Sequence, residues 1–133
     1  MGSAGYAENA FGKYARMASV TPSDLLKQLA FVCANSDFVS TYTVIVNDEK
    51  TLVVRVYLTN ETWINAFYNV VTGGVSFAWF RGRQRLYGKD NSKRIWHVHP
   101  FNATRIHQPC DPVDFETFLR EVENLYPHAY EGN

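Results

Sequence analysis

The stretch Asp37–Leu58, DFVSTYTVIVNDEKTLVVRVYL, decides the fold class of this chain of 133 residues. It holds two runs rich in β-branched and aromatic residues on either side of Asn47–Lys50, a polar cluster typical of a turn. In the second run, apolar residues recur at every second position and share one face: Leu52, Val54, Val56 and Leu58. The pattern predicts two neighbouring strands with one face turned to a core.

More strand-like runs follow at short intervals. They are TWINAFYNVV (62–71), VSFAWFR (75–81), RQRLYG (83–88) and KRIWHVH (93–99), and Pro100 stops the last one. Thr72–Gly74 is a hairpin signal between the first two of these runs. Because the connections are too short for crossover helices, we expect an antiparallel meander sheet of about five to six strands.

Helical patterns flank the strands. Thr21–Pro22 is a good helix start, and the apolar periodicity that follows ends near Asn35. Asp111–Pro112 marks a second start, before an apolar stripe that Pro127 ends. The order predicts an α+β fold with an N-terminal and a C-terminal helix packed on one face of the sheet. We expect three aromatic side chains to be buried there: Trp96, Phe115 and Phe118.

The chain reads as one α+β domain over residues 17–133. Residues 1–16 are interpreted as a flexible leader, with Met17 as a candidate native start and part of the leader as a candidate expression tag. The two cysteines lack metal-binding spacing and favour reduced intracellular thiols. With no signal peptide and no apolar run long enough for a bilayer, we expect a cytoplasmic protein without a membrane or a cofactor.

Histidines concentrate near the end of the strand region. Of four in the chain, His97 and His99 are separated by one residue, and on a strand they would share a face. Since Trp96 and Val98 on the other face are typical of a core, the histidines should point to an open or cleft-like face. His107 lies eight residues beyond His99, across a loop able to fold back.

Arginines surround this region, although the net charge of the chain is zero and overall charge gives no support to unspecific nucleic-acid binding. The arginines are Arg81, Arg83, Arg85, Arg94 and Arg105, and few acids lie near them apart from Asp90 and Asp111. A simpler explanation is a solvated edge strand, on which charge prevents aggregation.

Acid–base chemistry on a phosphodiester suits this composition best. Histidine titrates near neutral pH, so His97 and His99 can act as base and acid, with His107 as an auxiliary group. The expected phosphate ligands are Arg81, Arg83 and Arg94, and Asp90 would orient a histidine. Trp79, Phe80 and Tyr87 could stack on unpaired bases, although adjacent strand residues face opposite sides. The hypothesis is metal-independent RNA cleavage, in which a 2′-hydroxyl attacks its own phosphate.

Two alternatives stay open. A metal hydrolase would use His97, His99 and His107 as ligands, with Cys110 or Asp111 as a fourth, but the cationic surroundings oppose a divalent ion. We therefore expect no metal. A non-enzymatic binding or assembly module would instead use the sheet edge and the aromatic side chains, with protein or nucleic acid as its partner.

The stretch YNVVTGGVSFAWFRGRQRLYGKDNSKRIWHVHP, with a later histidine and VDFETFLREVE, resembles the TumE-type toxin family of toxin–antitoxin systems. The resemblance covers about Phe38–Tyr126 and includes Asp90–Asn91 and the three histidines His97, His99 and His107. It implies a toxin that acts on RNA and is paired with an antitoxin protein. A homodimer is a further expectation.

Overall fold

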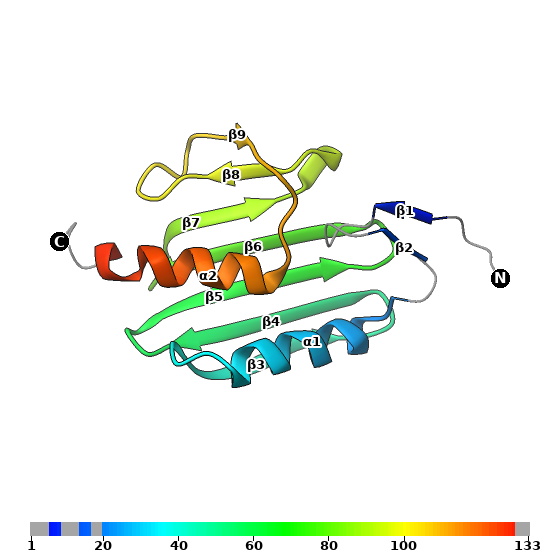
Figure 1. Ribbon diagram of the computed structural model, residues 1–133, viewed down its shortest axis with the longest axis horizontal. Helices are drawn as coiled ribbons and strands as arrows, with labels where there is room; N and C mark the ends of the chain where they lie inside the picture. The colour runs from blue at the N-terminus through cyan, green and yellow to red at the C-terminus, as the bar shows by residue number, and fades with distance from the viewer. Residues whose placement is uncertain (1–5, 9–13, 17–19, 130–133) are drawn as a thin grey trace.

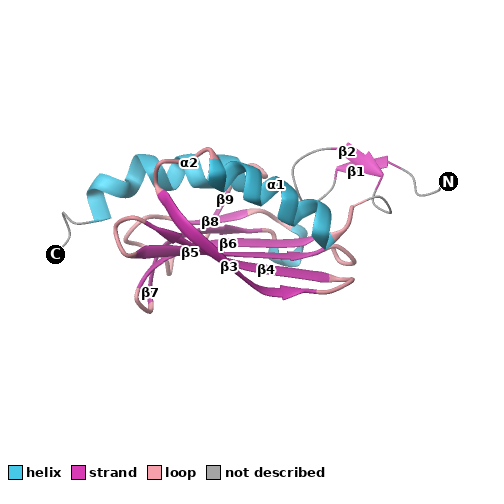
Figure 2. Cartoon of the chain, turned by 90° about the horizontal axis from the view of Figure 1, so that it is seen from below, coloured by secondary structure: helices cyan, strands magenta, loops and turns pink. Residues whose placement is uncertain are grey.

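The computed structural model describes residues 6–8, 14–16 and 20–129, and within them a seven-stranded antiparallel sheet carries two α-helices on one face (Figures 1 and 2). The strand order is sequential, so the sheet is the predicted meander. Its strands are β3 (Val39–Asn47), β4 (Thr51–Leu58), β5 (Thr62–Asn69), β6 (Gly74–Arg81), β7 (Gln84–Asp90), β8 (His97–His99) and β9 (Gln108–Pro109). The two-residue strand β9 gave no signal in the sequence and brings the strand number to seven.

The predicted leader overlaps a small separate hairpin. β1 (Tyr6–Glu8) and β2 (Tyr14–Arg16) pair in antiparallel fashion. Residues 1–5, 9–13 and 17–19 lie outside the described residues, so the flexibility expected for residues 1–16 stays a prediction.

The first helix begins as expected and the second does not. α1 (Pro22–Ala34) starts after Thr21, whose side chain forms a capping box with Asp24. α2 (Phe115–Leu125) starts three residues after the predicted Asp111–Pro112, because the Asp114 carboxylate accepts the N–H of Thr117 and serves as the N-cap. A 3-10 turn, η3 (Tyr126–Ala129), follows α2.

The core lies between the sheet and the helices. Alternate residues of β4, β5 and β6 point toward α1 and α2, and the largest fully buried side chains include Trp79, Phe77 and Phe118. Phe115 and Phe118 are buried as predicted, whereas Trp96 is half-buried at the margin of the core. In the part of the chain that the structure describes, the helices leave the other sheet face uncovered (Figure 2), and we name it the open face.

The predicted strand 93–99 is shorter than its sequence pattern indicated. Only His97–His99 form β8, and Ser92–Arg94 form a 3-10 turn in which Lys93 and Arg94 have positive φ angles. The Asp90 carboxylate accepts hydrogen bonds from the backbone N–H and the hydroxyl of Ser92. This local Asx-type bonding favours a turn over an extended strand.

The two edges of the sheet differ. β3 has nine residues, none of them charged and none proline, and Ile45 is 49% exposed. The opposite edge, β9, has two residues and ends in Pro109. Among the described residues, no helix is long and apolar enough to cross a membrane.

Candidate active site

Strand register places His97 and His99 on the open face. Asp90 of β7 pairs with His97, and Lys89 pairs with Val98. Paired residues point to the same side of a sheet, and Lys89 points to the helices because its ammonium lies 2.8 Å from Glu121 of α2. His97, His99 and Asp90 therefore share the opposite side, and for the two histidines the alternation in the sequence predicted this.

His99 is nevertheless buried, with a residue exposure of 4%, because the chain after Pro100 folds back over it. Its Nε2 lies 2.9 Å from Oδ2 of Asp90. Its Nδ1 lies 3.1 Å from the carbonyl oxygen of Thr104 and 3.3 Å from Nη2 of Arg85. Both ring nitrogens therefore have partners, and the role of His99 in an acid–base pair stays a prediction.

The partners of His99 constrain the roles of its ring nitrogens. Since Asp90 is a carboxylate, Nε2–H of His99 donates to it, and Nδ1 lies within reach of both the Arg85 guanidinium and the Thr104 carbonyl.

His107 completes a cluster of three imidazoles. Its ring centroid lies 4.4 Å from that of His99 and 6.1 Å from that of His97. Backbone hydrogen bonds fold the intervening loop, including Asn102 N–H to Leu86 and Ala103 N–H to Pro100. His107 is exposed, and the side chain of His97 is 22% exposed. Nδ1 of His97 is buried, lies 3.9 Å from Oδ1 of Asp90, and has no hydrogen-bond partner within residues 20–129.

Asp90 is held as a carboxylate beside these rings. Burial raises its pKa, but hydrogen bonds from Ser92 and His99, together with the His99 charge, outweigh that effect and leave the pKa below its ordinary value. Asp90 contacts His99 and also closes the turn at Ser92, and its predicted orienting role stays a prediction.

The predicted arginines do not gather at the histidines. Arg83 is exposed in the β6–β7 turn, and Arg94 is exposed beyond the other end of β7. Arg81 pairs in register with Thr62 and lies on the helix side of β6. The arginine that reaches the cluster is Arg85, and strand register is the signal that identifies it, since Arg85 pairs with Phe80 on the open face.

Two of the predicted base-stacking residues, Trp79 and Tyr87, point toward the helices and not toward the open face. Trp79 is fully buried, and its Nε1–H donates to Thr62 at 2.8 Å. Tyr87 stacks on Phe118 and donates to Glu121, on the helix side of the sheet. Neither ring can meet a base from the open face.

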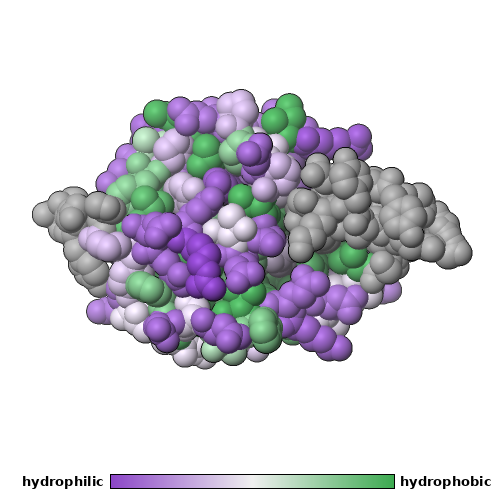
Figure 3. All heavy atoms as spheres, in the orientation of Figure 1, coloured by the Kyte–Doolittle hydropathy of each residue, from purple (hydrophilic) through white to green (hydrophobic). Residues whose placement is uncertain are grey.

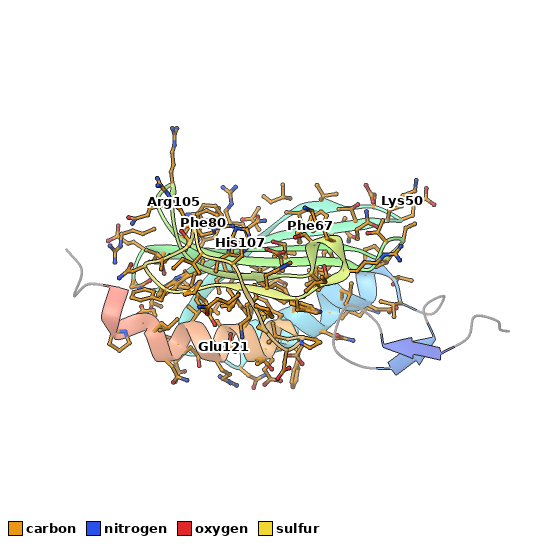
Figure 4. The ribbon with its side chains drawn as sticks, turned by 90° about the horizontal axis from the view of Figure 1, so that it is seen from above. Lys50, Phe67, Phe80, Arg105, His107 and Glu121 are labelled. Carbon is orange, nitrogen blue, oxygen red and sulfur yellow. The ribbon has the colours of Figure 1, made fainter. Side chains whose placement is uncertain are left out.

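Trp63 and Phe80 occupy the open face in their place. Phe80, next to Trp79 in the chain, faces outward as strand alternation requires, and it stacks on Trp63 with ring centroids 4.4 Å apart. Figure 4 shows Phe67, Phe80 and Arg105 on the side of the sheet away from the helices and Glu121 on the helix side. Trp63 is not among the residues predicted from the sequence, although its register with Phe80 follows from the hairpin at Thr72–Gly74.

The geometry does not favour the metal alternative. Within residues 6–8, 14–16 and 20–129, no group of three His, Cys, Asp or Glu residues is arranged to hold a metal ion. A metal at His99 would have to displace Asp90 or the Thr104 carbonyl from a ring nitrogen. Burial, with help from nearby acids and against the Lys89 charge, raises the pKa of the Cys110 thiol, which weakens it as a thiolate ligand.

Charge is segregated along the chain despite the net charge of zero. Residues 55–110 contain only two acids, Glu61 and Asp90. The basic residues of the same segment are Arg55, Arg81, Arg83, Arg85, Lys89, Lys93, Arg94 and Arg105. In residues 111–125, by contrast, acids outnumber the single base, Arg120. On the face of Figure 3, which looks onto the helices, hydrophilic residues cover much of the surface.

Fold and site together define an α+β protein with an open-faced antiparallel sheet and a cluster of three histidines, one of which is hydrogen-bonded to an aspartate. No family model, no curated protein and no solved structure matches this chain. Its function therefore has to be argued from the site.

Proposed function

We propose that this protein is a toxin-like, metal-independent endoribonuclease that works through the histidine cluster of its open face. The observation that carries the proposal is the meeting of His97, His99 and His107, with the outer two rings 6.1 Å apart between centroids. Two accessible imidazoles at that separation can flank one phosphate group. The third imidazole is fixed by Asp90 and supports the pair.

In the proposed reaction, His97 and His107 are the acid–base pair. The neutral imidazole takes the proton of a ribose 2′-hydroxyl, and the 2′-oxygen forms a bond to the adjacent phosphorus. The bond from phosphorus to the 5′-oxygen breaks, and the protonated imidazole gives its proton to that oxygen. The products are a 2′,3′-cyclic phosphate and a 5′-hydroxyl end.

Arg85 supplies positive charge next to this pair. Nη2 of Arg85 lies 3.3 Å from Nδ1 of His99, so a phosphate at the cluster would lie near a guanidinium. Charge that develops on the phosphate oxygens is stabilised by such fixed donors. Arg81, Arg83 and Arg94 lie farther away and would act only on more distant phosphates.

The deciding experiment is cleavage of mixed single-stranded RNA by the purified full-length chain in excess EDTA. We expect fragments that end in 2′,3′-cyclic phosphate, and no cleavage of DNA of the same sequence, which lacks the 2′-hydroxyl. If the folded protein cuts no RNA, the enzyme proposal is wrong.

A non-enzymatic nucleic-acid binding module is the second candidate. It is favoured by the burial of His99 and by the Trp63–Phe80 stack on the open face. RNA binding without cleavage would distinguish this candidate from the nuclease.

The edge strand β3 is the surface that we propose for a protein partner. Nine uncharged residues at a sheet edge can pair with an identical strand around a two-fold axis without bringing like charges together. We propose a second copy of the chain as the partner of this edge. An antitoxin partner rests on the family resemblance alone.

A further inference from the structure

A row of side chains crosses the open face and leads to the histidines. Cross-strand register aligns Trp63 of β5 with Phe80 of β6, and Phe80 with Arg85 of β7. The Arg55 guanidinium of β4 lies over the Trp63 ring, 4.4 Å from its centroid, and Arg85 contacts His99 of β8. We name this set, Arg55, Trp63, Phe80, Arg85 and His99, the cross-strand row.

The row holds aromatic surface between two cationic ends. The rings of Trp63 and Phe80 are nearly parallel, at 14°, and both residues are partly exposed. Trp63 is fixed further because its Nε1–H donates to the carbonyl of Gly82 at 3.0 Å. Phe80 and Arg55 cover the two faces of the Trp63 ring, so the face of Phe80 turned away from Trp63 is the one left for a base to stack on.

A buried nitrogen without a hydrogen-bond partner lies near each end of the cross-strand row. Nε of Arg55 is buried and makes no hydrogen bond to any described residue, and the same is true of Nδ1 of His97 beside the other end. Buried donors without partners are rare in folded proteins and call for an explanation. Neither nitrogen has exposed surface, and Nδ1 of His97 faces the Asp90 carboxylate, so an anionic ligand on the open face would meet them only after the surrounding side chains move.

The dimensions and shape of the row suit a single strand. It crosses five neighbouring strands, so it spans about 19 Å at the ordinary spacing between strands. Stacking platforms accept unpaired bases, whereas the bases of a duplex are already stacked and paired. Binding sites of this kind on small sheets take about four or more nucleotides.

From these observations we infer that the cross-strand row binds a single RNA strand and directs it into the histidine cluster. A base stacks on the face of Phe80 that Trp63 does not cover, Arg55 contacts a phosphate several nucleotides from the reacting one, and Arg85 lies near the reacting phosphate. The part of the inference that leads the RNA strand to the histidine cluster rests on the proposed ribonuclease function. Binding of RNA by the row does not depend on cleavage.

The test measures the equilibrium binding of a dye-labelled 2′-O-methyl RNA octamer, which lacks the attacking hydroxyl and cannot be cleaved. Arg55→Gln and Phe80→Leu should each weaken binding about 10- to 100-fold. Arg55→Gln should also reduce the slope of log affinity against log salt concentration by about one. A duplex of the same sequence should bind at least about tenfold more weakly than the single strand.

Matched control variants separate the row from the rest of the surface. Lys50→Gln removes the same charge as Arg55→Gln, and Phe67→Leu removes an aromatic ring from the same face. Both residues lie away from Phe80 along the strands (Figure 4). We expect each control to change binding by less than about twofold. The Trp63→Phe variant retains an aromatic ring and should bind the octamer more tightly than Trp63→Ala. It keeps the test of Trp63 valid if the alanine variant does not fold.

The outcomes for the row and for the nuclease are distinguishable. If the row variants bind the octamer as tightly as wild type, if the controls weaken it equally, or if the octamer does not bind, the row inference is overturned. If the octamer binds through the row but unmodified RNA stays intact, the row stands and the nuclease proposal fails. If RNA well below saturation is cut equally fast by wild type and row variants, the nuclease proposal stands and the row does not direct RNA to the histidines.

Discussion

Nε2 of His99 lies 2.9 Å from Oδ2 of Asp90, although nine residues separate them in the chain. The antiparallel pairing of β7 with β8 brings them together, since Asp90 faces His97 and Gly88 faces His99. The pair fixes one imidazole of the cluster and leaves the other two accessible. We therefore propose different roles for two histidines that look equivalent in the sequence.

Removing either accessible imidazole should reduce RNA cleavage far more than stability. His97→Ala and His107→Ala should each slow cleavage about 10²–10⁴-fold, the usual contribution of proton transfer by a positioned group. The double variant should be scarcely slower than the slower single variant, because groups that act as a unit are non-additive. The rate should fall at both low and high pH, since one imidazole must be neutral and the other protonated. Cleavage by both single variants at the wild-type rate would contradict these roles.

Asp90→Asn should destabilise the fold in a pH-dependent way. The carboxylate accepts hydrogen bonds from Ser92 and His99, so its loss should cost about 1–3 kcal/mol at neutral pH. Because the folded pKa of Asp90 is lowered, the stabilisation is present above the unfolded pKa of about 3.9 and is lost as pH falls through the folded pKa. Urea unfolding should show a difference between wild type and variant at pH 5 that shrinks at pH 3. If the difference in the free energy of unfolding were larger at pH 3 than at pH 5, the pKa of Asp90 could not be lowered in the folded protein.

Trp79→Phe should affect stability without affecting RNA. The substitution removes the hydrogen bond to Thr62 and part of a fully buried ring, so we expect a loss of about 1–3 kcal/mol in the free energy of unfolding. RNA affinity should stay unchanged, because Trp79 lies on the helix side. Phe80→Leu, at the neighbouring position, is the comparison variant. For it we expect the opposite result, weaker RNA binding and little change in the free energy of unfolding. Weaker RNA binding by folded Trp79→Phe would restore the stacking role that the sequence suggested.

Chelation should leave the activity intact. Both ring nitrogens of His99 already have protein partners, so we expect neither stoichiometric zinc by elemental analysis nor a loss of RNA cleavage in excess EDTA. Activity lost on chelation and restored by one divalent metal would support the metal hydrolase instead.

Ile45→Lys should weaken self-association through β3. Ile45 is 49% exposed, so the change in stability should stay within about 0.5 kcal/mol, while a charge at the edge opposes pairing with a second copy. Sedimentation equilibrium of wild type and variant measures the effect, with Val71→Lys, an exposed apolar residue in the β5–β6 turn, as the control. If wild type is monomeric at high concentration, the homodimer proposal is wrong.

Local patterns in the sequence predicted most of the fold. The alternation of Leu52, Val54, Val56 and Leu58 predicted a half-buried strand, and Thr21–Pro22 predicted a helix start, because both signals act between near neighbours in the chain. The predicted second helix start was wrong where two aspartates competed as caps, and Asp114 rather than Asp111 took the position. The predicted last strand was too long because the side chain of Asp90 bonded to Ser92 and made a turn.

The sequence by itself determined the antiparallel meander, the side of the helices and the face to which His97 and His99 point, because each depends on periodicity and on short connections. Only the tertiary structure decided which histidine is buried and which arginine and aromatic residues join it. His99 is buried because a loop folds back over it through hydrogen bonds at Thr104 and Leu86. Strand register positions Arg85 beside it. Those contacts join residues far apart along the chain or lying across neighbouring strands, and their geometry is fixed only when the whole sheet has formed.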